Sequence, residues 1–152
     1  MKQNFTDKSY ETPAGQVYKV KIGGLETTDD VVKRIRVNGF ECVGRVITQE
    51  NFPLEHRSTK EIEIEVIDPG RPFTEDEGLL FLKNAGLKRP THEHAIRFTE
   101  QCGVKTNGKY VVFLHKQNNG HVLYLNHKSE IFNAINPENG FGNECVLAGV
   151  RR

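Results

Sequence analysis

The side chains best suited to chemistry in this sequence are those of His92, Glu93 and His94, which are consecutive near the start of an expected helix. Imidazole and carboxylate groups bind zinc and transfer protons, so a metal or acid–base site is the first hypothesis. Residues two apart in a helix start about 200° apart around its axis, so the two imidazoles should diverge. Ile96 follows His92 by four positions, and an HExxH zinc motif is therefore absent. We expect solvent-facing residues here, with Glu93 near the positive end of the helix dipole.

Three further histidines lie around an expected β-hairpin. His115 and His121 bracket the turn, so they could be cross-strand neighbours that form a metal or pH-sensitive site with a third ligand. The alternative interpretation is that these histidines, His127 included, are exposed residues at strand ends. No four ligands have the spacing of a zinc site, so we expect no zinc and no other cofactor.

The three cysteines are candidates for nucleophilic chemistry only if a histidine and positive charge lie beside them. Cys42, Cys102 and Cys145 each fall within an apolar pattern, which favours buried, unreactive side chains. Their odd number and wide spacing are typical of reduced thiols in a cytosolic protein rather than of a disulfide framework. The sequence has no GxSxG motif, and nothing in it indicates a serine hydrolase.

Two groups of charged residues could bind ions. Glu61, Glu63 and Glu65 alternate with apolar residues on an expected strand, which indicates either a cation site or a solvated face that discourages edge-to-edge aggregation. A basic cluster around the junction of two helices indicates a solvated surface or a weak anion-binding surface. Its members are Lys83, Lys88, Arg89 and Arg97, with Arg151 and Arg152 at the C-terminal tail.

Composition limits the classes of partner. The 152 residues carry 21 basic and 20 acidic side chains, a net charge of +1, so neither nucleic acid nor an anionic membrane is expected as a partner. No apolar run is long enough to span a membrane. The polar start, Met1 to Gly15, does not resemble a signal peptide. We expect one cytoplasmic domain over residues 1–152, with a flexible segment at 1–12.

Three helices should position these candidates, and each is preceded by a threonine that can cap it. The first has aspartates in its opening turn, the second has a glutamate three positions after its threonine, and glycines end the second and third. The second helix is apolar on more than one side, which predicts burial between layers. The expected helices are Asp29–Asn38 after Thr27 or Thr28, Thr74–Ala85, and Thr91–Cys102 after a hinge from Gly86 to Thr91.

Alternating or continuous apolar runs predict the strands. An Asn-Gly pair at Asn119-Gly120 predicts a hairpin turn between two of them. Alternation in the third run is typical of an antiparallel or edge strand, whereas the fourth is apolar on both faces and should be central. The expected strands are Gln16–Ile22, Phe40–Thr48, Lys60–Ile67, Lys109–His115, His121–Asn126 and Cys145–Arg151.

These elements predict an α+β fold in which helices pack on a mainly antiparallel sheet. Two consecutive helices followed by a hairpin do not alternate as βαβ units, and the phosphate-binding motifs GxGxxG and GxxxxGK[ST] are absent. A doubly wound nucleotide-binding fold is therefore disfavoured. The expected core residues are Leu79, Leu82, Phe98, Val112, Leu114, Leu123, Leu125 and Val146.

The expected function is that of a non-enzymatic binding module for a protein or small-molecule ligand; a small enzyme with a histidine and cysteine site is the alternative. Polar loops mounted on a sheet are common recognition sites, which favours the loop Asn133–Asn143 together with the hairpin turn Lys116–Gly120. Phe132 and Phe141 would be apolar anchors in that site, or would fold inward and hold the loop to the core. Its hydrogen-bonding residues would be Asn118, Asn119, Asn136, Asn139 and Asn143.

Four segments resemble a group of small uncharacterised bacterial proteins: Asp30–Gly39, Val46–Pro53, Gly86–Ala95 and Val146–Arg151. That resemblance implies a shared fold and no known activity. The chain is also similar to C-type-lectin-like domains of the formylglycine-generating and retroelement-diversified type. The similarity lies in a helix followed by Gly-x-x-x-Pro-Thr at the start of a second helix, and in strands that end in Gly-Val-Arg-Arg. This second resemblance implies a C-type-lectin-like fold and transfers no catalytic residue.

Overall fold

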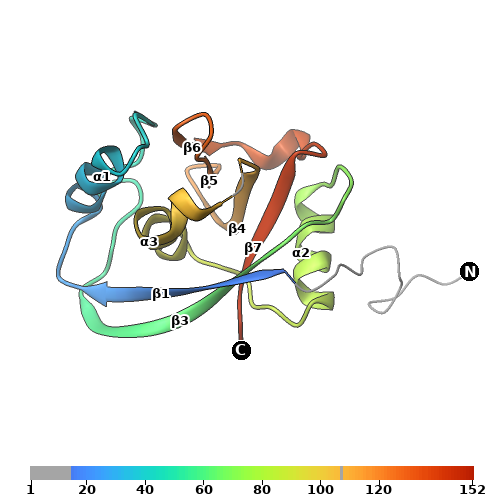
Figure 1. Cartoon of the computed structure of the whole chain (residues 1–152), viewed down its shortest axis with the longest axis horizontal. Helices are drawn as coiled ribbons and strands as arrows, with labels where there is room; N and C mark the ends of the chain where they lie inside the picture. Colours follow the sequence, from blue (N-terminus) through green and yellow to red (C-terminus); the bar gives the residue numbers. More distant parts are fainter. Residues whose placement is uncertain (1–14, 107) are drawn as a thin grey trace, which may run out of the picture.

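The computed structural model describes residues 15–106 and 108–152; the flexible segment expected at 1–12 lies outside them. Within this part of the chain, seven strands form one mixed sheet in the order β1-β3-β7-β4-β5-β6-β2. Helices lie on both faces of the sheet (Figure 1), and none of the described helices is long and apolar enough to cross a membrane. The strands are β1 (Gln16–Gly24), β2 (Cys42–Val43), β3 (Arg57–Ile67), β4 (Tyr110–Asn118), β5 (His121–Asn126), β6 (Ile131–Ile135) and β7 (Cys145–Val150); the helices are α1 (Thr28–Val37), α2 (Glu75–Asn84) and α3 (His92–Cys102), with the short 3-10 helices η2 (Gly103–Lys105) and η3 (Pro137–Asn139).

The predicted α+β class with a mainly antiparallel sheet is confirmed. Among the described strands, four of the six pairings are antiparallel, including the β4–β5 hairpin, and the parallel pairs are β4–β7 and β2–β6. In the hairpin turn Asn119 has φ 53° and Gly120 has φ 78°. Asn-Gly is favoured in such turns because both residues tolerate the left-handed backbone.

All three α-helices begin at a threonine whose hydroxyl accepts the backbone N–H of the third helical residue. The capping residues are Thr27, Thr74 and Thr91. The third residue of each helix returns a side-chain bond to the threonine N–H, so each end is a capping box. That residue is an aspartate in α1 and a glutamate in α2, whereas in α3 it is His94.

The central strand β4 is apolar on both faces, as predicted. Val111 and Phe113 belong to the hydrophobic cluster beneath α1 and α3, whereas Val112 and Leu114 belong to the cluster beneath α2. The consecutive helices α2 and α3 therefore pack on opposite faces of the sheet (Figure 1). The prediction that α2 is buried between layers is wrong, because α2 is covered on one side only. Of the eight predicted core residues, seven are buried and Leu79, on α2, is half-buried.

The sheet corrects the bounds of one expected strand and one expected loop, and it decides between two alternatives for β3. The strand expected over Phe40–Thr48 is reduced to β2, because the chain turns after Gly44. At Gly44 the Asn133 side chain fills the space that a Cβ atom would need. The loop expected over Asn133–Asn143 begins within β6, which pairs with β5. Of the two alternatives for β3, antiparallel or edge, the antiparallel one is observed, because β1 and β7 both pair with it in antiparallel orientation.

The parallel strands β4 and β7 separate towards their carboxyl ends, and the hinge between α2 and α3 (residues 86–91) fills the gap. The two strands pair from Tyr110 opposite Cys145 as far as Val112 opposite Leu147. Beyond that point Lys88 pairs with Val150, exchanging backbone N–H···O bonds of 2.8 and 3.0 Å. The chain thus passes from one face of the sheet to the other at the place where β4 leaves β7.

Candidate functional site

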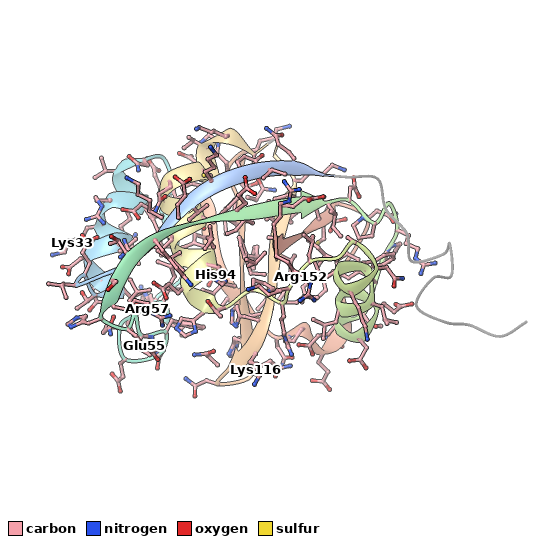
Figure 2. All side chains as sticks on the ribbon, turned by 90° about the horizontal axis from the view of Figure 1, so that it is seen from below. Lys33, Glu55, Arg57, His94, Lys116 and Arg152 are labelled. Carbon is pink, nitrogen blue, oxygen red and sulfur yellow. The ribbon has the colours of Figure 1, made fainter. Side chains whose placement is uncertain are left out.

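A cleft of about 650 Å³ lies at the carboxyl ends of β4 and β7. Four segments that are distant in sequence meet there: the start of β3, the hinge, the first turn of α3 and the end of β4. Viewed from below (Figure 2), Arg57, His94 and Lys116 come from three of these segments and lie around the same part of the face, on which Arg152 also lies. Lys33, on α1, lies at the margin of this view.

The cleft lining is basic, although the chain as a whole is nearly neutral. Five cations line it against the carboxylates of Glu55 and Glu93, an excess of three positive charges with the histidines neutral. Among the described residues, no carboxylate forms an ion pair with the three lysines. The five cations are Arg57, Lys60, Lys88, Arg89 and Lys116.

The two arginines of the cleft are already engaged. Arg89 donates Nε–H to the Leu114 carbonyl at 2.7 Å and a terminal N–H to the His115 carbonyl at 3.2 Å, on the edge that β4 exposes where it leaves β7. It also lies 3.6 Å from a Glu75 carboxylate oxygen. Arg57 forms ion pairs with Glu55 at 2.9 Å and with the cleft-lining Glu93 at 3.5 Å.

Glu93 is buried at the floor of the site, with only 6% of its surface exposed. Its Oε2 accepts the backbone N–H of Gly23 at 2.9 Å, because the first turn of α3 packs against the end of β1. The expectation that this residue faces solvent is therefore wrong. Its charge stabilises the β1 end and holds Arg57, and these contacts leave little of the carboxylate free for a ligand.

His94 presents one ring nitrogen to the cleft. The Thr91 backbone N–H donates to Nδ1 at 2.8 Å, so the neutral ring carries its proton on Nε2. Burial first, and then repulsion by Lys88, Lys60, Arg57 and His92, together lower the pKa of His94 to about 4. At neutral pH His94 is therefore an uncharged Nε2–H donor among cations.

His115 is a structural residue. It is 1% exposed, its Nδ1 donates to the Lys116 carbonyl at 2.7 Å, and its Nε2 accepts the Leu123 backbone N–H at 3.0 Å. This side chain replaces backbone pairing where the β4–β5 register shifts between Phe113 and Asn118. Burial lowers the pKa of His115 to about 4; the bond to Lys116 opposes the shift, while His92 and Arg89 add to it.

The other histidines do not join His115 in a metal site. His92 bonds the Pro53 carbonyl through Nε2 at 2.7 Å, and its ring centroid is 6.0 Å from that of His115. His121 bonds the Asn119 carbonyl within the hairpin turn, and His127 packs against Phe40. The expected exposed position at a strand end is wrong for His115. No group of three or more His, Cys, Asp or Glu residues in the described chain could hold a metal ion.

The cysteines lie away from the cleft. Cys102 and Cys145 are buried as predicted, and burial raises the pKa of both thiols. Cys42 is exposed, which corrects its expected burial, because β2 is a two-residue edge strand. None of the three lines the cleft, so the structure brings no cysteine to the histidines.

The aromatic residues expected as binding anchors fold inward. Phe132 is fully buried in the cluster beneath α1 and α3, and Phe141 is 8% exposed and stacked on Phe73 at 5.4 Å. Backbone bonds of 3.0 and 2.8 Å between Phe73 and Phe141 tie the loop to the chain before α2. Of the two alternatives for these rings, attachment of the loop to the core is the one observed.

The asparagines expected to bind ligand do not form one site. Asn118 lines the cleft and donates to the Asn51 carbonyl at 3.2 Å. Asn136 caps η3 by accepting the backbone N–H of Glu138. The side chains of Asn119, Asn139 and Asn143 are exposed.

A second hollow, of about 220 Å³, is lined by Tyr110, Tyr124 and Phe141 among others. Ligand binding by this loop stays a prediction.

Of the charged residues that the sequence indicated as candidates, some line the cleft and others are buried elsewhere in the fold. Lys88 and Arg89 line the cleft, whereas Arg97 is buried beside α1, donating to the Gly23 carbonyl and pairing with Glu26 and Glu100. Glu65 is also buried, because β3 is an interior strand, which corrects the solvated face expected for all three glutamates. It accepts the Gly15 backbone N–H at 2.9 Å.

Arg57 and Lys60 were not predicted as site residues, and Lys116 was expected only as part of the hairpin turn Lys116–Gly120. No local motif marks them, because they reach the cleft only when the start of β3 and the end of β4 come together. No family model, no curated protein and no solved structure matches this chain. The resemblances noted in the sequence therefore stay predictions, and function is inferred from the cleft itself.

Proposed function

We propose that this chain is a non-enzymatic binding module whose ligand is a small molecule with at least two negative charges, held in the cleft. The observation that carries the proposal is the convergence of Lys60, Lys88 and Lys116, which no carboxylate of the described chain neutralises. Three unpaired cations around one concave surface attract anions and raise their local concentration. The cleft volume of about 650 Å³ lies in the range of small-molecule sites, which suits a small molecule rather than a protein surface.

The enzyme alternative has less support. Its histidine and cysteine site would need a thiol beside an imidazole, and no cysteine lines the cleft. His115 has both ring nitrogens occupied by backbone groups, so it lacks a free position for proton transfer. As part of the proposal we retain a reducing, cytosolic location, in keeping with three free cysteines, and no nucleic-acid or membrane partner.

Calorimetric titration with pyrophosphate and citrate at fixed ionic strength tests the proposal. We expect saturable binding of at least one of these multivalent anions. Replacing Lys60, Lys88 or Lys116 by glutamine should weaken it about tenfold each, since a hydrogen bond to a charged group contributes about 1.5 kcal/mol. Lys33→Gln removes one positive charge from α1, outside the cleft lining, and serves as the matched control. Absence of binding, or equal losses in all four variants, would refute the proposal.

A further inference from the structure

We infer that the anionic group held in this cleft is a phosphoryl group rather than a carboxylate, and that His94 donates an uncharged hydrogen bond to it through Nε2–H. This inference rests on the proposed function and specifies its ligand class.

The first argument is the state of the arginines. A planar carboxylate is bound most specifically by the two parallel N–H groups of a guanidinium. Here the Arg89 guanidinium is held by two β4 carbonyls and Glu75, and that of Arg57 is held by Glu55 and Glu93. In both residues Nη2, which belongs to either fork of a guanidinium, already has a partner, so a carboxylate could form a fork only by displacing an existing contact.

The second argument is the kind of donor that remains. Lys60 comes from β3, Lys88 from the hinge, Lys116 from the end of β4 and His94 from α3. Each supplies a point-like donor, and together they surround the cleft from four different segments. A tetrahedral phosphoryl group presents oxygens in several directions and is readily bound by ammonium groups, so it matches this set better than a planar carboxylate does.

The third argument is the fixed proton of His94. A proton on Nδ1 would displace the Thr91 backbone N–H and break the capping box of α3. The groups that face this ring are Lys88 from the hinge, Lys60 and Arg57 from β3, and His92 on its own helix, and all four oppose a positive charge on it. Glu93, also on α3, is held by Gly23 and Arg57. Because Nε2 has no partner among the described residues, its N–H is available to a ligand oxygen.

The experiment compares ligands and His94 variants that keep the helix cap. Inorganic pyrophosphate and glycerol phosphate represent a free and an esterified phosphoryl group, and malonate represents a dicarboxylate of similar size. His94→Gln retains a capping oxygen and an N–H donor, whereas His94→Glu retains the cap but presents a carboxylate to the cleft. Urea unfolding of both variants checks that the fold is preserved.

We expect at least one phosphoryl ligand to bind about tenfold more tightly than malonate. His94→Gln should bind it within about threefold of the unmodified protein, and His94→Glu should bind it more than tenfold more weakly. Long-range ¹H–¹⁵N NMR of histidine-labelled protein should show the Nε2–H form of His94 at pH 7 before and after pyrophosphate addition, with a shifted Nε2 resonance in the complex.

Three results would overturn the inference. Equal affinity for malonate and both phosphoryl ligands would refute the ligand class while leaving anion binding in place. An unshifted Nε2 resonance, or an imidazolium in the complex, would refute the role of His94. If none of the anions binds, the proposed function itself fails, and this inference fails with it.

Discussion

His94 takes the position that glutamate takes in the capping box of α2, and the substitution changes what the helix end can do. A glutamate at this position would place a second negative charge beside Glu93. The imidazole instead accepts the Thr91 N–H with one nitrogen and keeps a donor on the other. One residue therefore stabilises the start of α3 and contributes a neutral hydrogen-bond donor to a cleft lined by cations.

The depressed pKa of His115 makes folding stability depend on pH. An unfolded histidine takes up a proton near pH 6.5, whereas folded His115 does so only near pH 4. Between these two pH values the unfolded state binds more protons than the folded state, so the free energy of unfolding decreases as the pH is lowered from about 6.5 to about 4. We expect a loss of about 2 kcal/mol from this residue between pH 7 and pH 5, measured by urea unfolding.

The variant His115→Gln isolates this contribution. Glutamine can still accept the Leu123 N–H but does not titrate, so the fall in stability between pH 7 and pH 5 should be smaller than in the unmodified protein. His94, with its pKa also near 4, contributes in the same direction. His56→Gln, at an exposed position, is the matched control for the removal of one imidazole. An identical pH slope in the His115→Gln variant would contradict the assignment.

At the residue scale, the sequence predicted features with local causes. The caps of α2 and α3 follow from threonine and the residues that come directly after it, and these were predicted correctly. The role of His115 was not predictable, because it depends on a register shift in β4 that leaves the Leu123 N–H without a backbone partner. Lys88 and Lys116 were named in two separate expected surfaces and Lys60 in none, because the proximity of the three lysines is a property of the assembled sheet.

At the element scale, α2 is covered by the sheet on one side only, so its leucines should differ in their contribution to stability. Leu82 is 2% exposed and packs beneath the hinge, whereas Leu79 is half-buried. We expect Leu82→Ala to cost about 2–5 kcal/mol of unfolding free energy, the usual large-to-small penalty in a core. Leu79→Ala, the matched variant on the same helix, should cost clearly less in the same urea titration. Equal losses would mean that α2 is buried on both sides after all.

The sequence predicted which segments form helices and strands better than it predicted which strands pair with each other in the sheet. Alternation in residues 60–67 was typical of an antiparallel or an edge strand; β3 is antiparallel to both β1 and β7, which flank it, and the pattern did not identify either neighbour. Its glutamates tolerate this position because Arg151 pairs with Glu63 and Glu65, and Glu65 also accepts the Gly15 N–H. The pairing of β3 with β7 joins residues more than 80 positions apart, such as Ile64 and Val150, and no local pattern encodes it.

For the molecule as a whole, net charge and local charge lead to different expectations. A net charge of +1 predicted neither nucleic acid nor an anionic membrane as a partner, but the cleft lining alone has an excess of three positive charges. Binding that depends on this local excess should be screened by salt. We expect pyrophosphate affinity to fall about tenfold or more when sodium chloride is raised from about 0.05 to about 0.5 M. The urea midpoint measured in parallel distinguishes screening from unfolding, and a salt-independent affinity would contradict an electrostatic site.

The position of β7 has a consequence for the order in which the molecule can be made. During synthesis β1 and β3 leave the ribosome early, and β4, β5 and β6 follow, yet these two groups of strands have no direct pairing with each other. β7 is the last strand of the chain and pairs with β3 on one side and β4 on the other. Until it arrives, the nascent chain carries two half-sheets with open edges, the kind of surface on which chaperones act and aggregation begins. The cleft, whose hinge is held by the pairing of Lys88 with Val150, is complete only after that strand has been inserted.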